Sequence, residues 1–252
     1  MQPTIVDAER DRADDVGDEP LLLAKHAVVA VGRDRQAAAE MLIGRGCDFL
    51  IMDDGLQSAH IHMDYALAIV DARHGVGNSH VIPGGPLRAP MSEQVKHVTG
   101  LLVMGRGQAA QPIVRMISRA AKPIFEAELR PLNPGALRGR QFLAFAGIGH
   151  PQRFFDAITV AGGQVALRRS FGDHHAFQLH ELAELESRAH KANLELITTA
   201  KDAVRLRHRE VPPLFRSKLN VLEIETAFDD PDASSAVIEQ TVAAYKVRKR
   251  IR

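Results

Sequence analysis

Short apolar runs alternate along the chain with stretches in which apolar residues recur at helical spacing. The strand-length apolar runs fall at residues 27–32, 49–52, 65–71, 101–105, 123–129, 141–146, 164–168, 194–199 and 219–225. Helical spacing predicts helices at residues 21–25, 34–45, 110–121, 152–161, 179–192, 201–207 and 236–246. Strands that alternate with helices are typical of parallel sheets covered by helices, so the pattern predicts an α/β fold.

One stretch rich in proline and glycine interrupts this alternation. Residues 130–139 read RPLNPGALRG, with two prolines and two glycines that favour a loop over a helix or strand. The alternation of strands and helices restarts beyond this stretch. We therefore predict two regions, one at residues 1–135 and a smaller α/β region at residues 140–252.

The apolar run FLIM at residues 49–52 leads directly into two adjacent acids, Asp53 and Asp54. Because the run is apolar throughout, it predicts a strand buried on both faces, and Gly55 then predicts a turn. The two carboxylates would lie at the carboxyl end of that strand, where open α/β sheets bind ligands. Adjacent acids at such a position resemble a Walker B element, in which an acid holds Mg²⁺ against nucleotide phosphates. The alternative is an Asp-Asp-Gly turn that only ends the strand.

Composition and charge narrow the classes of function. The 252 residues are 45% hydrophobic and 25% charged, as in ordinary globular proteins, and a net charge of +1 gives no reason to expect nucleic acid as a partner. Aromatic residues make up 5% of the chain and Trp is absent, which argues against base stacking. The single cysteine, Cys47, excludes an intramolecular disulfide. The sequence shows neither a signal peptide nor an apolar run of membrane-spanning length, so we expect a cytoplasmic location.

Basic and amide side chains near predicted strand ends are candidates for phosphate binding. Arg35 and Arg88 lie in or beside loops, and arginine forks suit phosphate, although most surface arginines are simply solvated. The sequence PGGPLR surrounds Arg88 with backbone that can approach a ligand closely. Asn78 fits either such a site or a turn. The five cations of residues 246–252 suit an anionic membrane surface or the solvated end of a helix.

Acidic and histidine residues in loops are candidates for acid–base chemistry. Asp18, in the sequence GDEP, is either a general base or a residue that caps the following helix. His174 follows an aspartate, and such a pair suits proton transfer because histidine titrates near neutral pH; its spacing from other histidines does not match a zinc site. The sequence TTAKD at residues 198–202 opens a helix, which favours either an anion near Lys201 or capping by Thr199.

Taken together, six stretches resemble the tetraacyldisaccharide 4'-kinase family, whose members phosphorylate the disaccharide precursor of lipid A. The six are VGDEPLLLA (16–24), DDGLQ (53–57), GVGNSHVIPGGPLR (75–88), FAGIGHPQRFF (145–155), GDHH (172–175) and TTAKDAVRL (198–206). They keep the order and spacing of the family from near residue 16 to near residue 206. The combination is far more specific than any one of these motifs.

The resemblance implies a P-loop-type parallel-sheet lobe followed by a smaller α/β lobe, and a defined reaction. That reaction is transfer of the ATP γ-phosphate to the 4'-hydroxyl of a tetraacyldisaccharide 1-phosphate. By the same resemblance, Asp18 paired with His174 would draw the proton from the sugar hydroxyl, and Asp53 and Asp54 would hold Mg²⁺. Phosphoryl transfer needs such a metal and a positioned base more than covalent catalysis. Three further side chains would assist at phosphate or substrate: Arg35, Arg88 and Asn78.

The resemblance also implies partners and a location. ATP, Mg²⁺ and an acylated disaccharide lipid would bind, and nucleic acid would not. A lipid substrate implies a peripheral position on the inner face of the inner membrane. Only the surfaces of the lobes and the basic residues 246–252 would make that contact.

The sequence departs from the family pattern at three places. The family carries a P-loop, GxxxxGK[ST], ahead of GDEP, in a longer N-terminal segment that also anchors the protein to the membrane. No such motif occurs in these 252 residues, so the backbone cradle and the phosphate-binding lysine are missing. Ala89 stands where the family usually has an acid, and Ala200 where it has a glutamate. We therefore expect an incomplete P-loop-type lobe with an exposed apolar sheet edge.

Two alternatives to an active kinase remain open. The first is a truncated, non-catalytic remnant that cannot bind ATP, with a misassigned start codon and a decayed gene as further explanations of the missing motif. The second is a metal-dependent α/β hydrolase that uses Asp53, Asp54 and His174. Such a hydrolase would bind a metal ion without a nucleotide.

Overall fold

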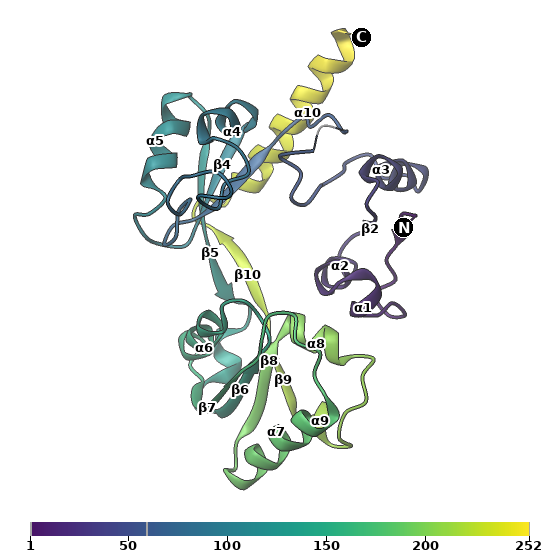
Figure 1. The fold of residues 1–252 in the computed structure, drawn as a ribbon, viewed down its shortest axis with the longest axis vertical. Coiled ribbons are helices and arrows are strands. Elements are labelled where there is room, and N and C mark those ends of the chain that lie inside the picture. Colours follow the sequence, from purple (N-terminus) through teal and green to yellow (C-terminus); the bar gives the residue numbers. More distant parts are fainter. Residues whose placement is uncertain (1, 59, 252) are drawn as a thin grey trace. The chain divides into compact units, whose positions relative to one another are not determined.

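The computed structural model describes residues 2–58 and 60–251 (Figure 1). The chain divides into two compact units. Their bounds are Met1–Leu50 with Pro131–Glu225 for unit 1, and Ile51–Arg130 with Thr226–Arg252 for unit 2. This division groups the first part of the chain with residues 131–225, whereas the predicted regions divide the chain at a single point. The boundaries at residues 135 and 140 stay a prediction.

Each unit contains both helices and strands. The elements of unit 1 are β1 Thr4–Ile5, α1 Ala13–Val16, α2 Asp18–Leu23, β2 Ala30–Val31, α3 Arg35–Gly44, the 3₁₀ helix η1 Pro134–Leu137, β6 Gln141–Ala146, α6 Pro151–Val160, β7 Gln164–Ser170, α7 Leu179–Lys191, β8 Glu195–Thr199, α8 Ala200–Leu206, α9 Phe215–Lys218 and β9 Leu219–Leu222. Those of unit 2 are β3 Leu67–Asp71, α4 Met91–His97, β4 Gly100–Met104, α5 Gln111–Arg119 and α10 Ala233–Ile251. Strands β5 Ile124–Pro131 and β10 Ile224–Phe228 cross the bounds of the units.

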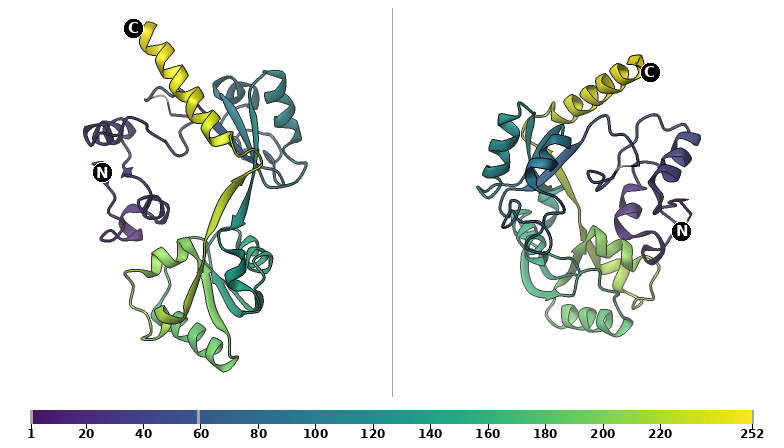
Figure 2. Two further views of the ribbon diagram at one scale, coloured as in Figure 1. Left: turned by 180° about the vertical axis from the view of Figure 1, so that it is seen from behind. Right: turned by 45° about the horizontal axis from the view of Figure 1, so that its top comes forward.

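Unit 1 is built on a four-stranded sheet in the order β7-β6-β8-β9, in which all neighbours run parallel. Alternate side chains of a strand point to opposite faces, and β6 is buried on both. Phe142 and Ala144 pack with α6, whereas Leu143 and Phe145 pack with α7. The two helices cover opposite faces of this sheet (Figure 2). The α/β class predicted from the sequence is confirmed by this helix-covered parallel sheet.

A second, smaller core fixes the N-terminal helices of unit 1. Val6, after β1, packs with Leu21 of α2 and Val204 of α8. These three residues come from distant parts of the chain, and they hold the start of α2 against α8. This packing determines where the Asp18 side chain lies.

Unit 2 contains a four-stranded sheet in the order β10-β5-β4-β3, whose β3, β4 and β5 run parallel. Leu101 and Val103 of β4 pack with Ile113 and Ile117 of α5 on one face. Ile69 of β3 points away from this core and is 67% exposed. Strand β3 is therefore buried on one face only.

The strand predicted at residues 49–52 is absent. The segment forms no strand, and Ile51 is 88% exposed. An apolar run becomes a buried strand only where neighbouring strands pair with its backbone. The sheet of unit 2 ends at β3, and no strand lies beyond it among the described residues. The exposure of Ile69 on the outer strand β3 agrees with the apolar sheet edge expected from the sequence.

Two other predicted strands differ from the structure. The run at residues 27–32 forms only the short β2, which pairs antiparallel with β1. The run at residues 219–225 forms two strands, β9 and β10, in different sheets. An apolar run shows where a strand can form but not which neighbour pairs with it. Helix α4 was not predicted, because its seven residues are too few for a clear period.

Candidate functional site

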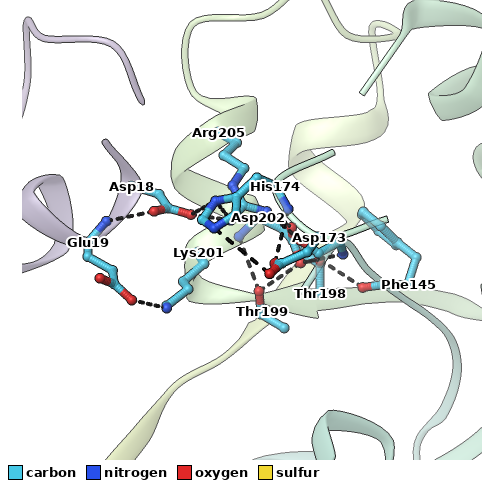
Figure 3. Close-up of polar contacts among 11 residues, drawn as sticks. Asp18, Glu19, Phe145, Asp173, His174, Thr198, Thr199, Lys201, Asp202 and Arg205 are labelled. Atoms are coloured by element: carbon cyan, nitrogen blue, oxygen red, sulfur yellow. Dashed lines mark hydrogen bonds and ion pairs between the residues drawn. The ribbon is translucent and has the colours of Figure 1, made fainter. Parts of the chain in front are cut away.

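The clearest polar cluster of unit 1 lies at the carboxyl ends of neighbouring strands β6 and β8. Figure 3 shows Asp18, His174, Asp202 and Arg205 meeting there. Asp18 opens α2, His174 lies in the loop after β7, and α8 carries the other two residues. Parallel strands bring their following loops to one edge, which explains how segments distant in sequence converge. We call these four side chains the Arg205 network.

Asp202 is the buried anchor of the Arg205 network. Its side chain is fully buried and accepts hydrogen bonds from Gly147 N at 3.1 Å and Thr199 Oγ1 at 2.8 Å. Burial raises the pKa of Asp202, and the bonds from Thr199 and Gly147 and the charge of Arg205 oppose that rise. Thr199 Oγ1 also accepts the Asp202 N–H at 3.1 Å, so Thr199 caps α8. The predicted capping role of Thr199 is confirmed.

Arg205 connects the other three members of the network. It lies three residues after Asp202 on α8, so both side chains share one helix face. Its Nη1 donates to Asp202 Oδ1 at 2.9 Å and to Gly147 O at 2.6 Å. Its Nη2 donates to Asp18 Oδ2 and lies 3.2 Å from His174 Nδ1. A single guanidinium thus orders two carboxylates, a backbone carbonyl and an imidazole.

Asp18 is a buried and ionised carboxylate. Only 7% of the residue is exposed, and Asp18 Oδ1 accepts the Glu19 N–H at 2.9 Å. Burial alone would raise the pKa of Asp18, but the hydrogen bond and charge of Arg205, with smaller effects of Glu19 N–H and His174, lower this pKa below its ordinary value. Asp18 is the first residue of α2, and Gly17 rather than an acid is its N-cap, with φ of 92°.

His174 lies at the open side of the network. Its side chain is 68% exposed, and its backbone has φ of 55°, held by N–H bonds to Gly147 O at 3.1 Å and Asp173 Oδ1 at 3.0 Å. Nδ1 lies 3.7 Å from Asp18 Oδ2, and Nε2 lies 3.9 Å from Asp173 Oδ2. A ring flanked by carboxylates and open to solvent is suited to receive a proton from a bound molecule.

Lys201, at the start of α8, forms an ion pair with Glu19. Its Nζ donates to Glu19 Oε1, which lies next to Asp18 in the chain. The Lys201–Glu19 pair is partly exposed and links α8 to α2. The arrangement favours a structural pairing of the two helices over the anion site that the sequence had left open.

Asp53 and Asp54 lie in unit 2, in an exposed turn. Asp54 has a positive φ of 50°, and its Oδ2 lies 3.5 Å from Arg88 Nη2. Among residues 2–58 and 60–251, no group of three or more His, Cys, Asp or Glu could hold a metal ion. Two adjacent carboxylates do fit Mg²⁺ that is also held by phosphates and water, because Mg²⁺ usually takes only one or two protein carboxylates.

Asn78 shapes the loop that carries Arg88. Its Nδ2 donates to Gly84 O at 2.8 Å, and its Oδ1 accepts the His80 N–H at 3.1 Å. A Cβ on Gly85 would lie 2.1 Å from Asn78 Oδ1, so only glycine fits there. The geometry supports the turn-forming role of Asn78, and a role in phosphate binding stays a prediction.

Arg35 opens α3 of unit 1 and follows Asp34, whose Oδ1 caps the helix by accepting the Ala37 N–H at 3.0 Å. Its side chain is half-buried and lies outside the Arg205 network as defined above. Its role at phosphate stays a prediction. The predicted site residues thus fall into two groups: Asp18, His174 and Arg35 in unit 1, and Asp53, Asp54, Asn78 and Arg88 in unit 2.

Sequence reasoning did not single out Asp202 and Arg205. Both lie inside the motif TTAKDAVRL, in which only Lys201 and Thr199 had been considered individually. The available signal was an acid and an arginine three residues apart, directly after an apolar strand that ends in two threonines. Such a pair indicates a buried ionic contact at a strand end, but the pattern does not reveal Asp18 as its third partner.

Comparisons with known proteins give one consistent result. The family model described as tetraacyldisaccharide-1-P 4'-kinase matches residues 1–243. The tetraacyldisaccharide 4'-kinase of Mesorhizobium japonicum is 55% identical over 98% of this chain and 73% of its own length. That of Agrobacterium fabrum is 48% identical over 97% of this chain and 71% of its own length.

A solved structure shares the fold. The crystal structure of "apo" form LpxK from Aquifex aeolicus in complex with ATP superposes with a TM-score of 0.69 at 21% identity. The match covers 95% of this chain and 74% of that one. At this identity the likeness concerns the fold, and it supports the α/β architecture found in both units.

Proposed function

Because this chain belongs to the tetraacyldisaccharide-1-P 4'-kinase family, we propose that Asp18 and His174 serve its phosphoryl transfer as the proton-accepting pair. The reaction moves the γ-phosphate of ATP to the 4'-hydroxyl of a tetraacyldisaccharide 1-phosphate. The observation that carries the role of the pair is its geometry. His174 Nδ1 lies 3.7 Å from Asp18 Oδ2, with the histidine open to solvent and the aspartate buried.

The chemistry of the pair follows from its two environments. As the 4'-oxygen bonds to the γ-phosphorus and ADP leaves, the hydroxyl O–H bond breaks and its proton passes to the pair. Asp18 has a lowered pKa, so it is ionised at neutral pH and a weak base on its own. His174, which is open to solvent, takes the proton, and the Asp18 carboxylate stabilises the imidazolium that forms.

The groups that would hold nucleotide and metal lie in unit 2. Asp53 and Asp54 would bind Mg²⁺ together with phosphate oxygens, and Arg88 beside Asp54 would add a fixed cation. Bound Mg²⁺ would neutralise charge on the transferring phosphate. The Aquifex aeolicus structure is a complex with ATP, and this likeness supports nucleotide binding here.

The lipid substrate places the protein at a membrane surface in this proposal. No helix among the described residues is long and apolar enough to cross a membrane. The basic end of α10 exposes Lys246, Lys249 and Arg250, which would attract anionic lipids on the cytoplasmic face. Arg252, the last cation of the predicted basic run, lies outside the described residues.

A transfer assay tests the proposal directly. The full chain is incubated with MgATP labelled at the γ-phosphate and tetraacyldisaccharide 1-phosphate in detergent, and label in the lipid is measured. We expect Asp18→Asn and His174→Gln to lower turnover by about 10²-fold or more, since a general base contributes about 10²–10⁴-fold. The matched control is Asp14→Asn, which removes an exposed acid that pairs with Arg209. Wild-type turnover in either site variant would contradict the role of the pair.

A further inference from the structure

Arg205 makes more contacts than an ion pair with Asp18 requires. Its side chain is 8% exposed and contacts four acceptor atoms. Three lie in other segments, on Asp18, Gly147 and His174, and the fourth is on Asp202 of its own helix. A guanidinium carries only N–H donors and stays charged in proteins. Each atom that receives a hydrogen bond from Arg205 must therefore offer a lone pair. This constraint applies to the imidazole as well as to the carboxylates.

The constraint determines where His174 carries its proton. Nη2 of Arg205 lies 3.2 Å from Nδ1 of His174, so Nδ1 is the acceptor and the neutral ring keeps its proton on Nε2. Nε2 faces Asp173 Oδ2 at 3.9 Å, and a carboxylate favours an N–H on that side. Asp18 Oδ2, at 3.7 Å from Nδ1, favours the opposite tautomer, but it already accepts a bond from the same Nη2.

We propose that Arg205 is a positioning residue that holds neutral His174 in the Nε2–H tautomer and leaves Nδ1 as the bare nitrogen facing Asp18. The charged groups that face the ring are Asp18 from α2, Arg205 from α8 and Asp173 from its own loop. Two of them act on Nδ1 in opposite directions, and Arg205 is the nearer one. Removing Arg205 therefore reverses the preference of the ring.

The catalytic consequence rests on the proposed function. The hydroxyl proton of the substrate is received on the side of the ring that faces Asp18, at Nδ1, and not at Nε2. As the O–H bond breaks and the Nδ1–H bond forms, Nη2 releases Nδ1 and keeps its bond to Asp18 Oδ2. The new Nδ1–H then faces the Asp18 carboxylate, which stabilises the imidazolium.

Nitrogen NMR of the full chain tests the tautomer without ATP or lipid. The ring nitrogens of histidine are ¹⁵N-labelled, and the His174→Gln variant identifies the His174 resonances among the 12 histidines. Above the pH at which the ring loses its charge, we expect a bare Nδ1 and a protonated Nε2 in the unaltered chain. A protonated Nδ1 there would overturn the proposal.

Variants of Arg205 separate positioning from general structure. Arg205→Met should shift the neutral ring to the Nδ1–H tautomer, because only Asp18 then faces Nδ1. Arg209→Met is the control, since Arg209 pairs with Asp14 at 2.9 Å and should leave the His174 spectrum unchanged. An Nε2–H tautomer retained in folded Arg205→Met would also overturn the proposal. Where Arg205→Met fails to fold, the spectrum of the unaltered chain decides alone. An unaltered chain that shows the expected tautomer but no kinase turnover would count against the proposed function. It would not count against the role of Arg205.

Discussion

The two units each contain an acid–arginine pair near a candidate site, and the two pairs differ in burial. In unit 1, Asp18 and Arg205 are both 8% exposed at their side chains, and Asp202 and His174 join them. In unit 2, Asp54 and Arg88 lie 3.5 Å apart with side chains 68% and 62% exposed. Buried charges need complete pairing, whereas exposed ones are shared with water. The first pair is therefore built to hold a fixed geometry, and the second is open to a ligand.

The largest expected effect comes from breaking the buried pair. Arg205→Met leaves Asp18 and Asp202 buried without their shared cation, which should lower the free energy of unfolding by about 3–5 kcal/mol. Urea unfolding of the full chain, followed by circular dichroism, measures this loss. A loss below about 1 kcal/mol would mean that the network is no more rigid than a surface ion pair.

A smaller effect is expected from the cap that supports the network. Thr199→Val keeps the shape of the side chain but removes the hydroxyl that accepts the Asp202 N–H and donates to the Asp202 carboxylate. Loss of such a cap costs about 0.5–2 kcal/mol. The same urea titration measures this loss of stability. Thr241→Val in α10 is the matched control, because the Thr241 hydroxyl donates to Val237 O at 2.7 Å. An equal loss in both variants would deny Thr199 a special role.

The two buried acids should respond to pH in opposite directions. The pKa of folded Asp18 lies below its unfolded value, so its stabilising contribution is present above the unfolded pKa and is lost as pH falls through the folded pKa. The pKa of folded Asp202 is raised, so its ionisation costs stability as pH rises through the folded pKa. Between about pH 7 and pH 3, Asp18→Asn should therefore lose less stability than the unaltered chain, and Asp202→Asn more. Urea unfolding at both pH values measures how much the free energy of unfolding changes between them. An equal change in the two variants would contradict the opposite pKa shifts of Asp18 and Asp202.

The smallest effect on stability is expected from the exposed pair. Arg88→Met should change the free energy of unfolding by about 0–1 kcal/mol, because both partners are solvated. The measurement is again urea unfolding in the absence of ligand. A loss as large as that of Arg205→Met would remove the contrast between the two units.

Much of the fold was predictable because its patterns are local. Helices α3 and α7 and strand β6 begin and end within two residues of the predicted ranges, since each is specified by its own apolar spacing. The strand predicted at residues 49–52 was wrong because the burial of a strand depends on its neighbouring strands, which the apolar run itself does not encode. The single strand predicted at residues 219–225 was wrong for the same reason, because its residues divide between β9 and β10 in two different sheets.

The candidate site was predictable only in part. Asp18 and His174 were matched through motifs, and their contact depends on α2 packing against α8, which no single motif contains. Arg205 was missed because its partners lie far away in the sequence, at Asp18 and in the loop of His174. Long-range ionic contacts of this kind become visible only when the fold places the strand ends together.

Binding of MgATP tests the central claim most directly, because a kinase must hold the nucleotide before it can transfer phosphate. Isothermal titration is carried out with the full chain, Arg88→Met and Asp18→Asn. We predict measurable binding by the full chain, weaker binding by about tenfold or more in Arg88→Met through loss of a charged hydrogen bond, and unchanged binding in Asp18→Asn. Absence of MgATP binding by the full chain, or equal weakening in both variants, would contradict the account.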